Sequence, residues 1–181
     1  DLSLEEEKNI LQTLKKSHAK MPGKDFFESL DSAPNLVVLL SYPLSNLSKN
    51  IFNKFLEGAF FPTVKMINYS EFAHGVYQNI CYQYERGKLT NFIFLNGSKF
   101  DEQMILGARK MLSSQYPVWE IKTSLPDDFK ILEFEMIINY FILKWLERKD
   151  IDQVNWSGKE KQKYLYDVEK YNSVLHPKEG L

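Results

Sequence analysis

The sequence predicts an α/β fold in which helices cover both faces of a parallel sheet, a three-layer α/β/α sandwich. Apolar runs of strand length begin near positions 36, 63, 91 and 117, and the best of them lack the alternation of a half-exposed strand. Their starts are about 25 to 28 residues apart, which leaves room for a helix in each connection. Strands linked through helices by right-handed crossovers lie parallel in one sheet.

Composition and charge fit one globular domain. The 181 residues are 44% hydrophobic and include 13 Phe, 10 Tyr and 3 Trp, enough to fill a sizeable core. The 23 Lys and Arg nearly balance the 24 Asp and Glu, so no overall field attracts a nucleic acid or an anionic membrane. Cys81 is the only cysteine, which excludes an internal disulfide and a thiolate metal cluster. We therefore expect a reducing, cytoplasmic setting, no metal site, and Cys81 as a small buried hydrophobe.

The first half of the chain contains two predicted strands and three predicted helices. A capping box, Ser3 with Glu6, starts the first helix. The strand that follows is the most apolar, and Pro43 ends it. Ser45 or Asn46 is expected to cap the next helix. The predicted elements are a helix over residues 3 to 20, a short helix at "DFFESL", a strand in "NLVVLLSYP", a helix over residues 45 to 58 and a strand at "TVKMI".

The second half continues the pattern and ends in a long helix. The predicted elements are a strand at "NFIFLNG", a helix at "DEQMILGARKMLSSQ", a strand at "PVWEIKT" and a helix over residues 128 to 149. The last helix is apolar around much of its circumference, which predicts burial against the sheet and against another chain or domain. Glu133, Glu135 and Lys144 interrupt it, so it is too polar to span a bilayer. The N-terminus lacks the features of a signal peptide, and we expect a soluble protein without a membrane partner.

Polar stretches follow three of the predicted strands: "SYPLSN", "NYSEFAHG" and "NGSKFDE". Ligands of open parallel sheets bind beyond the carboxyl ends of the strands, so these stretches should form a functional rim. The loop with Ser41, Tyr42 and Ser45 can offer hydroxyl and backbone N–H groups to an anion at a helix N-terminus. The same residue types also suit ordinary helix capping.

The second stretch places a carboxylate, an imidazole and a glycine within five positions. Glu71 suits a general base and His74 a general acid or ring-opening group, because partial burial can tune both towards neutral pH. Their spacing of three also suits one helical turn, in which the pair would only cap or form a salt bridge. Gly75 allows a sharp turn of the backbone. The residues alone leave both interpretations open.

This stretch resembles a known family. "NYSEFAHG" is similar to the Glu-x-x-His-Gly segment in the second half of sugar isomerase (SIS) domain proteins, such as the isomerase half of glucosamine-6-phosphate synthase and the fructosamine-6-phosphate deglycases. The resemblance starts at "NLVVLLSYPLSNLSKNIFNKFLEGAF" and continues through "NFIFLNG" to the last long helix and the lysine-bearing tail "DQVNWSGKEKQKYL". It implies a SIS-type sandwich, of the flavodoxin-like or Rossmann-like kind.

The resemblance also implies a site. Glu71 takes the place of the family's base, which moves a proton between C1 and C2 of an opened sugar phosphate, and His74 is a weaker candidate for ring opening. The implied substrate-binding residues are Ser41, Tyr42, Ser45, Ser70, Gly75 and one or more of the tail lysines Lys159, Lys161 and Lys163. Ala73 and Val76 depart from the family, whose members commonly have a basic residue before the histidine and a proline after the glycine, so some local charge is missing.

The family's Ser/Thr-rich phosphate loop usually lies in the first SIS half, and this chain shows no clear copy of it. The resemblance therefore implies one SIS-type domain over residues 1–181, the C-terminal half of a two-domain protein. Residues 1–34 would form an N-terminal helical segment, and residues 150–181 a tail that packs on or over the site, although the tail's charges also suit a solvated surface helix. An N-terminal SIS half or a second subunit would complete phosphate binding, in a homo-oligomer such as a dimer.

The expected function is aldose/ketose isomerisation or deglycation of a phosphorylated sugar or amino-sugar, without a cofactor and without a nucleic-acid partner. The alternative is a non-catalytic sugar-phosphate sensor, or a scaffold half that dimerises through the helix at residues 129–149. His18 and His176 are expected to be surface residues, because single unclustered histidines rarely bind a metal.

Overall fold

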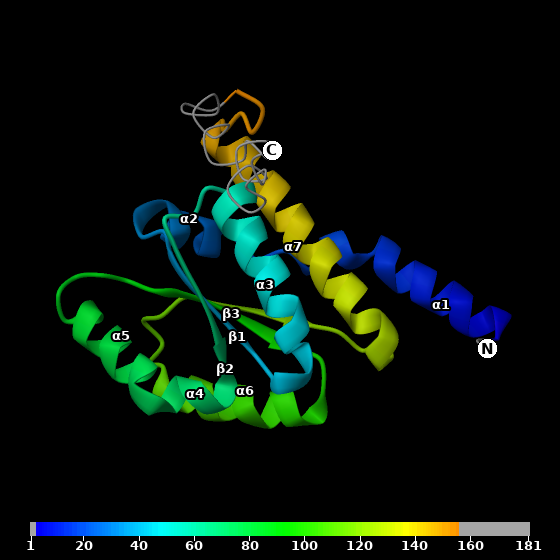
Figure 1. Ribbon diagram of the computed structural model, residues 1–181, viewed down its shortest axis with the longest axis horizontal. Helices are drawn as coiled ribbons and strands as arrows, with labels where there is room; N and C mark the ends of the chain where they lie inside the picture. Colours follow the sequence, from blue (N-terminus) through cyan, green and yellow to red (C-terminus); the bar gives the residue numbers. More distant parts are fainter. Residues whose placement is uncertain (1–2, 156–181) are drawn as a thin grey trace, which may run out of the picture.

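The computed structural model describes residues 3–155. A four-stranded sheet, parallel throughout, has the strand order β2-β1-β3-β4 (Figure 1). The strands are β1 (Asn35–Leu40), β2 (Thr63–Asn68), β3 (Asn91–Asn96) and β4 (Val118–Lys122). All four predicted strands and their parallel arrangement are thereby confirmed.

Helices cover both faces of the sheet (Figure 1). One layer contains α2 (Lys24–Ser32), α3 (Ser45–Asn53) and α7 (Asp127–Lys149). The opposite layer contains α4 (Tyr69–Glu71), α5 (Tyr77–Tyr84) and α6 (Lys99–Met111). α1 (Leu4–Lys15) lies beside α7 and extends beyond the sheet. The predicted three-layer sandwich is therefore confirmed.

Alternate residues of β1 enter two separate cores, because successive side chains of a strand point to opposite faces. Leu36 and Val38 pack with α2, α3 and α7, whereas Val37 and Leu39 pack with α4 to α6. All four are buried, as the unbroken apolar run predicts.

The buried face of α7 supplies the centre of the larger core. Phe141 is fully buried, and its ring lies 5.0 to 6.4 Å from five other aromatic rings, those of Phe26, Phe27, Phe55, Phe61 and Trp119. Burial of α7 against the sheet is thus confirmed. Its opposite side exposes Leu132 and Leu143 in this chain.

The first helix ends earlier than predicted. The capping box is confirmed, since Glu6 accepts from the Ser3 backbone N–H at 2.8 Å and the Ser3 hydroxyl accepts from the Glu6 N–H at 3.3 Å. The α-helix stops at Lys15, and a tighter 3₁₀ turn, Ser17–Lys20, follows. This turn brings the buried Ser17 and the ammonium of Lys20 to the carboxylate of Glu133 on α7, with the Lys20 Nζ 2.5 Å away.

The segment after β1 also differs from the prediction. β1 ends at Leu40, and a 3₁₀ turn, Tyr42–Leu44, contains Pro43 and runs directly into α3. The capping role predicted for Ser45 or Asn46 is wrong, because Leu44 occupies the cap position and no side chain caps the helix.

Two smaller predictions also need correction. α6 ends at Met111 rather than near residue 115. Cys81 is half-buried, because α5 presents Ile80 to the core and leaves the cysteine at the edge of the contact.

His18 is exposed as predicted and packs edge-on to Tyr140, whereas His176 lies outside the described residues. No helix in the described part of the chain is long and apolar enough to cross a membrane.

Candidate functional site

Glu71 lies at the carboxyl edge of the sheet, beside a cavity of about 240 Å³. It follows β2 directly in the short helix α4, whose start is capped by Asn68: its side-chain oxygen accepts from the Ser70 N–H at 3.2 Å. The cavity is lined by Leu40, Ser45, Ser48, Met66, Ile67, Asn68 and Glu71. We call it the Glu71 cavity. The Glu71 side chain is exposed and has no hydrogen-bond or ion-pair partner among the described residues.

Two hydroxyl groups from α3 share this cavity with Glu71. Ser45, a candidate from the sequence, is brought to it, and so is Ser48, which the sequence analysis missed. Ser48 lies one turn further along the same helix, and its hydroxyl donates to the Ser45 carbonyl at 2.6 Å. Once Ser45 is placed on a helix, the i, i+3 spacing is the signal that would have found Ser48.

His74 is not part of the Glu71 cavity. The backbone leaves the helical conformation at His74, with φ −96° and ψ 65°, and at Gly75, with φ +95°, whereas Glu71 and Phe72 are helical. No salt bridge joins Glu71 and His74 in the described part of the chain. The sharp turn predicted at Gly75 is confirmed.

The remaining predicted residues are scattered or lie outside the described residues. Ser70 is exposed, and its hydroxyl bonds to the Asn68 side chain at 3.2 Å instead of lining the Glu71 cavity. The side chain of Tyr42 and all of Lys159, Lys161 and Lys163 lie outside what the structure describes.

Positive charge lies next to the Glu71 cavity and not within it. None of the described residues that line this cavity is basic. A shallow hollow of about 400 Å³ along the outer edge of β2 shares Ser48 with it and adds Lys49 and Lys65. Neither lysine belongs to a motif, so the sequence alone gives no signal for them.

A second cavity, of about 160 Å³, lies where the order of the strands reverses. In the sheet, β1 and β3 are neighbours. The segment after β1 leads to β2 on one side and the segment after β3 leads to β4 on the other side, so the two segments diverge at this point. The cavity is lined by Ser41, Pro43, Leu44, Ser98, Asp101, Asp127, Lys130 and Ile131. We call it the switch-point cavity. Among the described lining residues, Ser41 is the only candidate from the sequence; Asp101 belongs to the polar stretch "NGSKFDE" but to no recognised motif.

Tyr69 ties the rim to the sheet beneath it. Its buried hydroxyl donates to the Leu95 carbonyl at 3.1 Å. Burial, with smaller contributions from the negative charges of Asp101 and Glu120, raises the pKa of Tyr69. The phenol therefore remains neutral and serves as a fixed hydrogen-bond donor.

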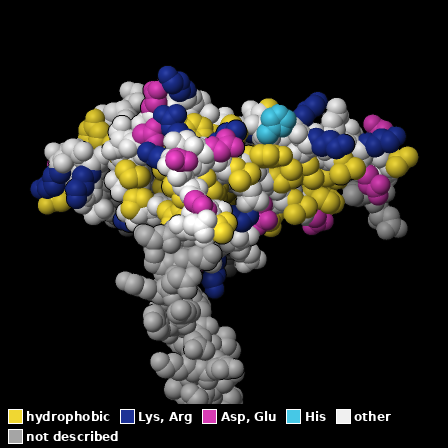
Figure 2. Space-filling view, turned by 90° about the horizontal axis from the view of Figure 1, so that it is seen from above, with side chains coloured by type: hydrophobic (Ala, Val, Ile, Leu, Met, Phe, Trp, Pro, Cys, Tyr) yellow, Lys and Arg dark blue, Asp and Glu magenta, His cyan; other side chains and the backbone are white. Residues whose placement is uncertain are grey.

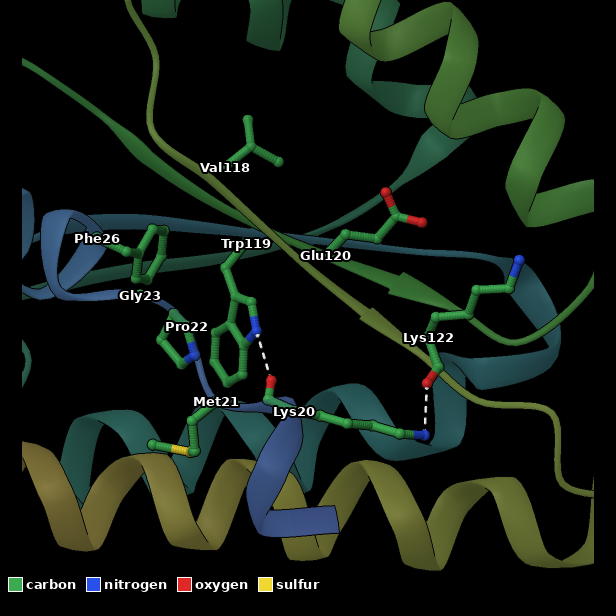
Figure 3. Close-up of a pocket in the computed structure, with 9 residues that line it drawn as sticks. All are labelled: Lys20, Met21, Pro22, Gly23, Phe26, Val118, Trp119, Glu120 and Lys122. Atoms are coloured by element: carbon green, nitrogen blue, oxygen red, sulfur yellow. Dashed lines mark hydrogen bonds between the residues drawn. The ribbon is translucent and has the colours of Figure 1, made fainter. Parts of the chain in front are cut away.

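A further hollow, of about 390 Å³, lies along β4 at the other edge of the sheet (Figure 3). Trp119 Nε1 donates to the Lys20 carbonyl at 3.0 Å, and Lys20 Nζ donates to the Lys122 carbonyl at 2.8 Å. Glu120 bonds to Arg109 at 2.9 Å. Burial opposes ionisation of Glu120, but hydrogen bonds from Asn96 and Arg109 outweigh it and lower the pKa of this carboxyl group. With its charges already paired, this hollow mainly anchors the segment after α1.

Among residues 3–155, no group of three or more His, Cys, Asp or Glu is placed to hold a metal ion. The described side chains of the Glu71 cavity and the neighbouring hollow include a carboxylate, hydroxyls and lysines.

Comparison with known proteins supports the fold. No family model and no curated protein matches the sequence. A crystal structure from Silicibacter pomeroyi DSS-3, provisionally named a phosphosugar isomerase, is similar with a TM-score of 0.59 at 12% sequence identity. The match covers 81% of this chain and 47% of that chain, so this chain spans about half the length of its structural neighbour. The chain thus has a phosphosugar isomerase-like α/β fold.

Proposed function

We propose that this chain is one half of a phosphosugar-processing protein, an aldose/ketose isomerase or a deglycase of phosphorylated amino sugars, with Glu71 as its base. One observation carries the proposal: Glu71 lies at the carboxyl edge of the sheet on a cavity that also contains the hydroxyls of Ser45 and Ser48. The phosphosugar isomerase-like fold supports the substrate class.

The proposed reaction moves one proton between neighbouring carbons. The Glu71 carboxylate removes a proton from C1 or C2 of the open-chain sugar, and the same proton returns to the other carbon from the carboxylic acid. The enediol or enolamine formed between these steps carries developing negative charge on oxygen. The hydroxyls of Ser45 and Ser48 are suited to donate hydrogen bonds to that oxygen. The step is redox-neutral overall and uses no cofactor.

Phosphate recognition needs positive charge from outside the Glu71 cavity. We propose Lys49 and Lys65 of the neighbouring hollow for this role, because both lie close to Ser48. The tail lysines and an N-terminal SIS half or second subunit remain further proposed contributors. His74, Ser70, Gly75 and Tyr42 remain proposed contacts to the sugar.

A non-catalytic sugar-phosphate sensor is the second candidate. Two observations favour it: Glu71 is exposed in this chain, and His74 is not among the described residues that line the Glu71 cavity. A sensor would gain stability on binding a sugar phosphate and form no product.

The test is Glu71→Gln in the full-length protein, with Glu85→Gln as the matched control. Glu85 is an exposed carboxylate just after α5 and is not among the residues that line the Glu71 cavity. Hydrogen exchange at C1 and C2 of fructose 6-phosphate, glucose 6-phosphate and glucosamine 6-phosphate is followed by NMR in D₂O. We expect Glu71→Gln to slow exchange by about 10²-fold or more, as for loss of a general base, and to retain binding.

Unchanged exchange in Glu71→Gln, with Glu85→Gln also unchanged, would exclude Glu71 as the base. No exchange in the unmodified protein, together with a rise in its melting temperature on adding the same phosphates, would favour the sensor.

A further inference from the structure

Asp101 has a buried carboxylate oxygen without a partner. The residue is 1% exposed and forms part of the wall of the switch-point cavity. Its Oδ2 accepts from the Gly97 N–H at 2.9 Å and from the Ser98 hydroxyl at 2.9 Å, and the Asp101 N–H donates to the Ser98 hydroxyl at 3.1 Å, which caps the start of α6. Its Oδ1 accepts no hydrogen bond from any described residue. Capping thus explains one oxygen of this carboxylate and leaves the other unexplained, although a buried acceptor normally has a donor.

The charge of Asp101 has no counter-ion in the described part of the chain. Among residues 3–155, Lys130 is the only cation that lines the switch-point cavity, and it forms an ion pair with Asp127 at 2.5 Å. The same ammonium donates to the Gly97 carbonyl at 2.7 Å, which holds it against the β3 loop. With Lys130 paired to Asp127, the cavity carries one unbalanced negative charge.

The remaining walls indicate what would fill the cavity. Ser41 is buried, and its hydroxyl has no hydrogen bond to another described residue. Leu44 and Ile131 add apolar contacts. The volume of about 160 Å³ exceeds the roughly 30 Å³ share of one water, so a molecule of several heavy atoms can enter.

The position of the switch-point cavity in the sheet independently supports a ligand site there. In open α/β sheets, ligands bind in the crevice where the strand order reverses, and the switch-point cavity lies in that crevice. An anionic group would be repelled by the carboxylate of Asp101, whereas a cationic donor would be attracted to it.

From this arrangement we propose that the switch-point cavity binds a small amino alcohol, with its ammonium on Asp101 and a hydroxyl group on Ser41. The site is separate from the Glu71 cavity and does not depend on the proposed role of Glu71.

The test uses 2-amino-1,3-propanediol as the probe and glycerol as its neutral counterpart of the same shape. Both are titrated into the full chain at neutral pH, and the backbone amides of Gly97, Ser98 and Asp101 are followed by ¹H–¹⁵N NMR. We expect saturable shifts with the amine and binding of glycerol weaker by about 10-fold, because only the amine forms a charge-assisted bond.

Asp101→Asn is the diagnostic variant. Its amide oxygen can still accept from Gly97 and Ser98, while its NH₂ group presents a donor in place of the Oδ1 acceptor. We expect it to weaken amine binding by about 10-fold or more. Asp128→Asn is the matched control, since it removes one exposed carboxylate from the first turn of α7 and is not in the cavity lining; binding should not change.

Three results would overturn the proposal: no saturable shifts at the three amides, equal affinity in a folded Asp101→Asn variant, or glycerol or inorganic phosphate binding as tightly as the amine. The NMR spectrum of each variant shows whether it is folded. Glu71→Gln should leave amine binding unchanged, so the two proposals can fail separately.

Discussion

Gly75 determines how the chain leaves the Glu71 segment. Its φ of +95° is a conformation that residues with a Cβ rarely adopt, and it lies at the break between the helical turn of Glu71 and α5. A Cβ added at this position would meet no atom within 4 Å, so only the backbone resists a larger residue.

Gly75→Ala should therefore lower the free energy of unfolding by about 1 to 2 kcal/mol through backbone strain alone. Gly23→Ala is the control, because a Cβ there is equally unobstructed and φ is −66°. Urea denaturation of both variants checks this. Equal stability of the two variants would show that φ at Gly75 is not what requires glycine.

Glu133 has a structural role that the sequence alone does not indicate. In the sequence it interrupts an apolar helix and argues against a membrane span. In the structure it is fully buried, and it bonds to Lys20, Ser17 and Thr123. Buried charges need such partners, and these came from residues up to 116 positions away.

At the scale of elements, charges join the end of α2 to the end of α7. Asp31 lies 2.5 Å from Arg148 and 2.6 Å from Lys149. The hydrogen bond from Arg148 lowers the pKa of Asp31, with Lys149 adding to the effect and burial opposing it. Because the folded pKa is below the unfolded one, the stabilisation is present above the unfolded pKa and is lost as pH falls through the folded pKa.

Asp31→Asn should accordingly lower the free energy of unfolding by up to about 1 kcal/mol at pH 7, the range of partly exposed ion pairs. The difference from the unmodified protein should shrink as the pH falls below the usual range of an aspartate, and also at high salt. Denaturant unfolding at several pH values and salt concentrations measures both trends. A difference that stayed constant with pH would mean that packing, and not charge, connects the two helices.

At the scale of the whole molecule, one side exposes many apolar side chains. Figure 2 shows hydrophobic side chains gathered over α1 and the adjoining part of α7. The large exposed residues on these two helices are Leu4, Leu11, Leu132, Tyr140 and Leu143. Contiguous apolar surface of this kind marks interaction sites. We propose that this face contacts a companion half or a second copy of the chain; the structural neighbour is about twice as long as the match.

Leu143→Glu in the full-length protein should weaken self-association or association with the companion by about 10-fold or more, because a charge would be buried in the contact. Leu106→Glu is the control, since Leu106 is exposed on α6 in the opposite helical layer. Analytical ultracentrifugation measures both variants. Weakening by Leu106→Glu alone would place the contact on the other side of the molecule.

Much of the fold could be predicted because buried segments can be recognised from the pattern of apolar residues within each segment. Each strand is a short apolar run, and most helices show their capping residues or apolar spacing within a few turns. The position of Glu71 at the rim followed from this, since the end of β2 is visible in the sequence. The 3₁₀ turns at Ser17–Lys20 and Tyr42–Leu44 could not be predicted, because contacts to α7 and α3 shape them.

The sequence by itself determined the layered α/β architecture, the parallel strands and the carboxylate at the end of β2. Only the tertiary structure decided which side chains meet there: it left His74 out of the lining of the Glu71 cavity, joined Ser48 to Ser45, and placed Ser41, Asp101 and Lys130 around one cavity. The physical reason is that apolar periodicity records what each segment buries, whereas the pairing of polar groups depends on which strands become neighbours and how closely the helices approach them.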